Sequence, residues 1–124
     1  NQRYVKFMGR LSDQDLIDSY IGSKALIMTQ KEDFGITSVE AQSFGVPVIA
    51  YKSGGASETV IDGKTGIFFE NQTIDSLAKA IEEFGKIEID SKVCTIQADK
   101  FAKGKFIRRI LEAVNINGKR RQTR

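Results

Sequence analysis

Short apolar runs alternate along this chain with segments of helical spacing, and this order constrains the fold more than any other feature. Residues 25–28 and 48–51 are continuous apolar runs of strand length, typical of parallel strands that are buried on both faces. Residues 5–9 alternate inward and outward side chains, and residues 66–69 form another strand-like run. Because helical patterns separate these runs, we expect an α/β fold with a parallel sheet flanked by helices.

Capping residues mark where the helices begin and end. Ser12 and Thr73 suit helix N-caps, whereas Gly45 and Gly85 suit helix ends. We expect helices at about 12–21, 37–44, 56–61 and 73–84, then C-terminal helices after Asp90 and at 106–114. The apolar face of the first helix is expected to hold Leu16, Ile17, Tyr20 and Ile21, whereas Val93, Ile96 and Phe101 indicate the helix after Asp90.

The residue types present exclude several kinds of chemistry. The chain has no histidine, so a Ser-His-Asp or Cys-His site cannot form within it. Cys94 is the only cysteine, which excludes an intrachain disulfide and favours a cytoplasmic setting. We expect Cys94 to be a small buried apolar residue rather than a nucleophile.

The formal charge of +3 comes from the C-terminal end of the chain. Residues 118–124 carry four basic side chains and no acidic one, whereas residues 1–117 are nearly neutral. We therefore expect one domain over 1–117, a flexible basic tail over 118–124, and no nucleic-acid partner. Binding of the tail to an anionic membrane or nucleic acid is the alternative.

A candidate anion site lies in the loop at 29–37, which leaves a buried strand and enters a helix. Ligands of such folds bind beyond the carboxyl ends of the strands. The backbone amides of Gly35, Ile36 and Thr37 would point out of the helix start, where the helix dipole also favours an anion such as a phosphate.

Two acidic residues flank this site. Glu32 precedes it, and Glu40 lies one helical turn after Thr37, where its carboxylate can accept hydrogen bonds from a vicinal diol. Acids on both sides of a phosphate-binding turn match a ligand with sugar hydroxyls on both sides of its phosphates. A sugar nucleotide has this layout.

Three motifs in order give the chain a specific family resemblance. Glu32 and Glu40 enclose Phe34-Gly35, and they are followed by Ala41-Gln42-x-x-Gly45-x-Pro47-Val48-Ile49-Ala50 and by Gly54-Gly55-x-x-Glu58-x-Val60-x-Asp62-Gly63-x-Thr65-Gly66. This series resembles the retaining glycosyltransferases of the group-1 (family 4) class. The resemblance implies a partial C-terminal, Rossmann-like domain of a GT-B fold, in which two such domains enclose the active site.

The resemblance also implies a role for each site residue. Glu32 would bind hydroxyls of the donor sugar and act as the catalytic residue. The loop of Phe34, Gly35, Ile36 and Thr37 would bind sugar hydroxyls and the diphosphate, although Phe34 is equally well explained as a core plug. Glu40 would bind the ribose diol, and the backbone at Met8 and Gly9 would border the nucleobase. We expect Gly54, Gly55 and Glu58 to be structural.

The implied activity is transfer of a hexose, with retention, from a GDP- or UDP-linked sugar to a glycan or lipid acceptor, as in polysaccharide biosynthesis. The Glu-Asp-Phe-Gly form of the loop favours mannose carried by GDP. No metal or other cofactor is expected. The acceptor site and a basic Arg/Lys pair would lie in parts that precede residue 1, so this chain alone is expected to be inactive. A lipid acceptor would bring the full-length enzyme to the cytoplasmic face of a membrane. The alternative is a non-catalytic module that binds a nucleotide or a protein.

Overall fold

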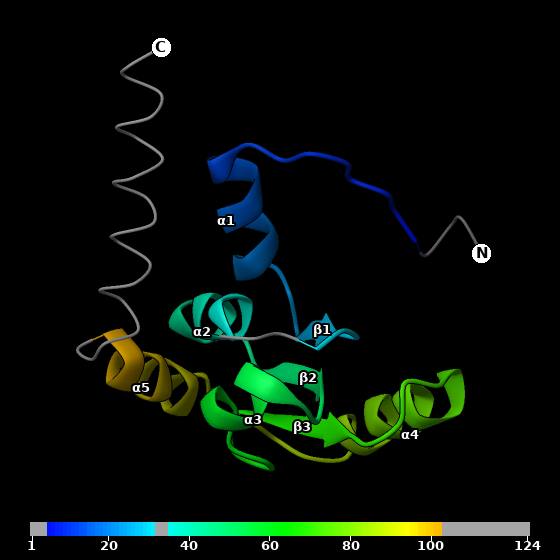
Figure 1. Ribbon diagram of the computed structural model, residues 1–124. Coiled ribbons are helices and arrows are strands. Elements are labelled where there is room, and N and C mark those ends of the chain that lie inside the picture. Colours follow the sequence, from blue (N-terminus) through cyan, green and yellow to red (C-terminus); the bar gives the residue numbers. More distant parts are fainter. Residues whose placement is uncertain (1–4, 32–34, 103–124) are drawn as a thin grey trace.

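A parallel sheet of three strands forms the centre of the computed structural model, which describes residues 5–31 and 35–102. The strands β1 (Leu26–Met28), β2 (Val48–Tyr51) and β3 (Gly66–Phe69) lie side by side in that order (Figure 1). Ile49 of β2 pairs with Ile27 on one side and with Ile67 on the other. This arrangement confirms the expected parallel, Rossmann-like α/β fold.

Five helices occupy the described ranges, close to the positions expected. They are α1 (Asp13–Ile21), α2 (Ile36–Ser43), α3 (Gly54–Thr59), α4 (Ile74–Phe84) and α5 (Ser91–Ala102). The two predicted N-caps are confirmed, because Ser12 accepts a hydrogen bond from the Asp15 amide at 3.1 Å and Thr73 accepts one from the Ser76 amide at 3.2 Å. The helix expected at 106–114 and the basic tail lie outside the described residues. None of these five helices combines the length and apolar composition needed to cross a bilayer.

The strand β2 is buried on both faces, as its continuous apolar run predicts, whereas Ile27 of β1 is 44% exposed. Successive residues of β2 point to opposite sides, so Val48 and Ala50 face one core while Ile49 faces the other. The first core lies beneath α1, α2 and α3 and includes Tyr20, Met28, Ala41, Val46, Ala56 and Val60. The second lies against α4 and includes Ile67, Phe69 and Ala80.

The end of α2 brings α5 close to it. Gly45 has φ of +77°, and its amide donates to the Gln42 carbonyl at 2.9 Å, which confirms the predicted glycine at the helix end. A Cβ at this position would lie 3.0 Å from the Cβ of Ser91, the first residue of α5. The glycine therefore lets the start of α5 pack against the end of α2 (Figure 1).

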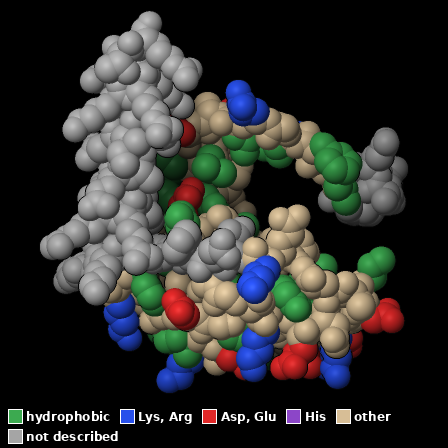
Figure 2. All heavy atoms as spheres, in the orientation of Figure 1, with side chains coloured by type: hydrophobic (Ala, Val, Ile, Leu, Met, Phe, Trp, Pro, Cys, Tyr) green, Lys and Arg blue, Asp and Glu red, His purple; other side chains and the backbone are tan. Residues whose placement is uncertain are grey.

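The strand predicted at residues 5–9 is wrong. These residues run as an extended segment outside the sheet, and the Phe7 side chain is 92% exposed. Figure 2 shows open space between this segment and the body that carries the sheet. Alternating side chains favour an extended backbone, but a strand also needs a neighbour, and within the described ranges β1 pairs with β2 alone.

The buried face of α1 also differs from the expectation, and the face that α5 buries includes a polar residue. In α1 only Tyr20 is buried, and Ile21 is 66% exposed. In α5 the buried residues are Cys94, Gln97 and Ala98, whereas Ile96 is 58% exposed. Small residues let α5 approach α2 closely, and a polar side chain, Gln97, lies in the contact because it finds a buried carbonyl partner.

Candidate functional site

The first turn of α2 places backbone amides that have no partner within the helix at the carboxyl edge of the sheet. Gly35 occupies the N-cap position with φ of +64°, and it has no side chain to cap the helix. The amides of the first helical residues, Ile36, Thr37 and Ser38, have no partner within the helix. Ile36 is 40% exposed and Thr37 is half-buried, so this turn reaches the surface. Its amides and the helix dipole suit an anionic ligand.

Gly35 is required at this turn for space as well as for conformation. A Cβ here would lie 2.6 Å from the Gly55 carbonyl oxygen and 2.9 Å from the Thr59 hydroxyl oxygen. The start of α2 is thus in direct backbone contact with α3. The sequence motif containing Gly54-Gly55, which we expected to be structural, packs against the candidate anion site.

A buried hydroxyl pair fixes this contact. The Ser38 and Thr59 hydroxyls are hydrogen-bonded to each other. Ser38 Oγ also lies 3.0 Å from the Gly35 carbonyl oxygen, and Thr59 Oγ1 lies 3.0 Å from the Gly55 carbonyl oxygen. Ser38 and Thr59 are fully or almost fully buried, so solvent water does not compete with these hydrogen bonds.

Two glutamines complete the buried polar cluster. Gln42 Nε2 donates to the carbonyls of Ser38 and Thr59, both at 3.1 Å. Gln97 Nε2, from α5, donates to the same Thr59 carbonyl at 3.1 Å. We call Ser38, Gln42, Thr59 and Gln97 the Thr59 cluster. Sequence reasoning missed it, because these helices contain several polar residues and no local pattern marks these four as buried.

Glu40 faces α1 in an environment that disfavours its charge. Burial raises the pKa of the Glu40 carboxyl above its ordinary value of 4.5, and the negative charge of Asp13 raises it further. Burial, followed by the charge of Glu40, likewise raises the pKa of Tyr20. A half-buried carboxylate next to another carboxylate is stabilised by hydrogen-bond donors, and a vicinal diol supplies two.

The remaining predicted site residues are placed as follows. Glu32 and Phe34 lie outside the described residues. Met8 and Gly9 lie on the extended segment before α1, where Gly9 has φ of +63° and a Cβ added to it would meet no atom within 4 Å. Their roles stay predictions. Cys94 is fully buried, and burial raises the pKa of its thiol above the ordinary value, in keeping with the predicted inert, apolar role.

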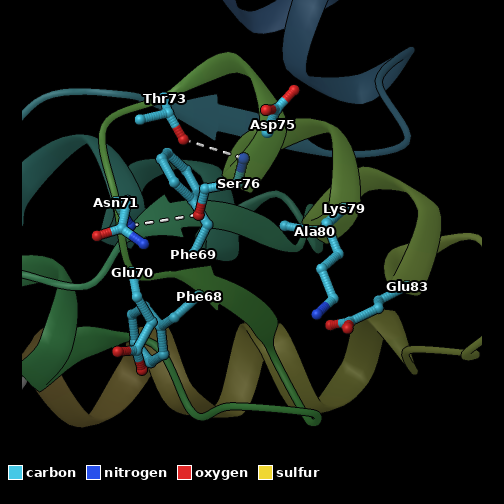
Figure 3. A pocket seen from close by; sticks show the side chains of 10 residues that line it. All are labelled: Phe68, Phe69, Glu70, Asn71, Thr73, Asp75, Ser76, Lys79, Ala80 and Glu83. Carbon is cyan, nitrogen blue, oxygen red and sulfur yellow. Dashed lines mark hydrogen bonds between the residues drawn. The ribbon is translucent and has the colours of Figure 1, made fainter.

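The structure also contains a hollow of about 430 Å³ that the sequence did not predict. It lies between the end of β3 and α4 and is lined by polar side chains such as Asn71, Ser76 and Lys79 (Figure 3). The Lys79 and Glu83 side chains extend toward each other along α4. Because α4 covers the opposite face of the sheet from α2, this hollow is separate from the candidate anion site.

Comparison with known proteins decides the family. The model of the family described as "Glycosyl transferases group 1" matches residues 1–101. The chain belongs to this family. The matched range includes the whole of the candidate site.

Among curated relatives of this group-1 chain, a GDP-mannose-dependent monoacylated alpha-(1-6)-phosphatidylinositol monomannoside mannosyltransferase from Corynebacterium glutamicum is 40% identical over 87 residues. The alpha-1,3/1,6-mannosyltransferase ALG2 from Dictyostelium discoideum is 41% identical over 75 residues. These matches cover 64% and 60% of the chain, but 23% and 18% of the two relatives.

A solved structure supports the same fold. Sucrose-phosphate synthase from Thermosynechococcus elongatus aligns with a TM-score of 0.63 and 25% identity. The alignment covers 98% of this chain and 30% of that protein. The chain therefore corresponds to a minor part of the length of the relatives that it matches.

The contact between Gly35 and Gly55 generates a prediction about stability. Gly35→Ala should lower the free energy of unfolding, in urea titrations, by about 1–3 kcal/mol more than Gly9→Ala. Both glycines have φ near +64°, so the conformational strain of alanine is shared, but only position 35 lacks room for a Cβ. Equal losses in the two variants would show that the close contact does not constrain α2.

The raised pKa of Glu40 predicts how stability depends on pH. The folded protein binds the Glu40 proton more tightly than the unfolded chain does, so this residue lowers stability as pH rises from about 4.5 through the raised pKa. Glu40→Gln removes that penalty. The variant should therefore gain stability relative to wild type as pH rises from 4 to 7, in urea unfolding at each pH.

Glu82→Gln is the matched control, because Glu82 is an exposed acid on α4. It should show no such gain. A Glu40→Gln variant that loses stability relative to wild type between pH 4 and 7 would contradict the assignment of Glu40 as a strained carboxylate.

Proposed function

We propose that this chain supplies the donor-binding part of a glycosyltransferase that transfers a hexose, with retention, from a nucleoside-diphosphate sugar. The observation that carries the proposal is the arrangement on α2. The first-turn amides, which have no partner within the helix, suit the diphosphate, and Glu40, one turn further on, suits the ribose diol. Membership of the group-1 family supports the same class of reaction.

The donor that we propose is GDP-mannose. Two relatives, from Corynebacterium glutamicum and Mycolicibacterium smegmatis, are named as GDP-mannose-dependent mannosyltransferases, and the Dictyostelium relative is named as a mannosyltransferase. The Glu-Asp-Phe-Gly form at residues 32–35 is in keeping with this choice. A glycan or a lipid is the proposed acceptor, bound by a second domain, with the enzyme in the cytoplasm or at its membrane face.

The chemistry that these residues can supply is positioning and charge stabilisation. The α2 amides would hold the leaving diphosphate as negative charge develops on it, and Glu32 would orient the donor sugar through its hydroxyls. Glu40 would anchor the ribose and so fix the diphosphate relative to the helix start. The scheme uses only backbone amides and carboxylates, and none of its steps involves a cofactor.

The ribose assignment predicts a loss of nucleotide affinity. In the protein at its full natural length, Glu40→Gln should weaken GDP binding by about 1.5–3 kcal/mol, measured by titration calorimetry, because charged hydrogen bonds to a diol are lost. Glu82→Gln, on α4, is the control and should bind GDP as wild type does. Unchanged GDP affinity in Glu40→Gln would mean that the ribose lies elsewhere.

Substitution of Glu32 should affect turnover of the donor rather than affinity for the nucleotide. Glu32→Gln should lower turnover of GDP-mannose more than it lowers GDP affinity, because its proposed contact is to the sugar and not to the nucleotide. Transfer to an acceptor and calorimetric GDP titration measure the two effects. Equal losses in both would contradict the sugar-binding role.

A further inference from the structure

The Thr59 cluster links three helices to the turn on which the proposed donor site depends. Ser38 lies in α2, Thr59 ends α3, and Gln97 comes from α5, 38 residues further along the chain. Gln97 is not one of the residues to which we assign a ligand contact. Its hydrogen bond nevertheless ends on Thr59, whose hydroxyl oxygen lies against the Gly35 turn.

The hydroxyl pair in this cluster couples Gly35 to α3. Each hydroxyl has one proton, so Ser38 and Thr59 share two protons among their contact with each other and their contacts with the carbonyls of Gly35, Gly55 and, at 3.5 Å, Ala56. When Ser38 donates to the Gly35 carbonyl, Thr59 donates to Ser38, and the hydrogen bonds join Gly35 to α3. When Thr59 donates to the Gly55 or Ala56 carbonyl, Ser38 donates to Thr59, and the hydrogen bonds join Ser38 of α2 to α3.

The glutamines hold Thr59 in the position that this pair requires. Gln42 is fully buried and directs its amide nitrogen at two carbonyls, while its Oε1 has no hydrogen-bond partner among the described residues. Buried polar atoms are normally hydrogen-bonded, so the two bonds that this amide nitrogen donates fix the orientation of the Gln42 side chain. Gln97 adds a second donor to the Thr59 carbonyl from the α5 side.

We propose that Thr59 and Gln97 are positioning residues for the diphosphate: their hydrogen bonds fix the first turn of α2, so that α5 controls affinity for the phosphates without touching them. This inference rests on the proposed function. It assigns a role to a buried threonine and to a glutamine on a helix remote from the ligand. It also explains why a polar residue occupies the buried face of α5.

The test compares binding of GDP and GMP in the protein at its full natural length. A residue that only supports folding should change both affinities alike, whereas a residue that positions the α2 amides should change the affinity ratio of GDP to GMP. Gln97→Met keeps the side-chain length and removes the donor, and the Thr59 carbonyl keeps its bond from Gln42. Thr59→Val keeps the shape and removes the hydroxyl.

We expect Gln97→Met and Thr59→Val to lower the GDP-to-GMP affinity ratio by about threefold to tenfold, the effect of one hydrogen bond. Thr59→Ser, which restores a hydroxyl, should return the ratio to the wild-type value. Ile96→Met, an exposed change on the same helix, should leave it unaltered. Circular dichroism establishes that each variant is folded, and if Thr59→Val does not fold, Gln97→Met decides.

Three results have distinct meanings. A lowered GDP-to-GMP ratio in Gln97→Met and Thr59→Val, with the wild-type ratio in Thr59→Ser, supports the inference. An unchanged ratio in a folded Gln97→Met, with wild type binding GDP normally, overturns the inference and leaves the proposed function intact. Failure of wild type to bind GDP or UDP overturns the proposed function and the inference together.

Discussion

The backbone contact between Gly35 and Gly55 is the constraint on which the candidate site depends. The two glycines follow neighbouring strands of a parallel sheet, so the topology brings them to the same edge. Their approach leaves no room for a Cβ at Gly35, and the Ser38–Thr59 hydroxyl pair holds it. The direction in which the α2 amides point follows from this contact, and with it the place where an anion can bind.

Glu40 shows a conflict between stability and binding at the same site. Burial and the charge of Asp13 disfavour its ionised form, so its position is unfavourable for the protein without a ligand. In the proposed complex, a ligand diol would donate hydrogen bonds to this carboxylate. Strain of this kind is common at functional sites, because an unsatisfied group binds a complementary ligand strongly. The Thr59 cluster is the opposite case, since nearly all its polar atoms are satisfied internally and it contributes rigidity.

Much of the fold could be predicted from the sequence because local signals agree with the global structure. The apolar runs at β2 and β3, the caps at Ser12 and Thr73, and the helix end at Gly45 are all confirmed. The strand at residues 5–9 is wrong because local alternation carries no information about whether a pairing partner is present. The helix after Asp90 is confirmed, but the burial of Gln97 in it could not be predicted, because its hydrogen-bond partner, Thr59, is remote in sequence. The helix start that forms the candidate anion site could be predicted, whereas the cluster behind it depends on long-range contacts that no local pattern encodes.

Binding of the diphosphate to the amides at the start of α2 is the step from which the proposed roles of Glu40, Thr59 and Gln97 follow. Amide chemical-shift changes in the isotopically labelled protein, titrated with GDP, test this binding most directly. We expect the largest changes at Gly35, Ile36 and Thr37, with small changes along α4. Largest changes at Asn71 and Ser76, beside the hollow at the end of β3, with α2 unaffected, would contradict it.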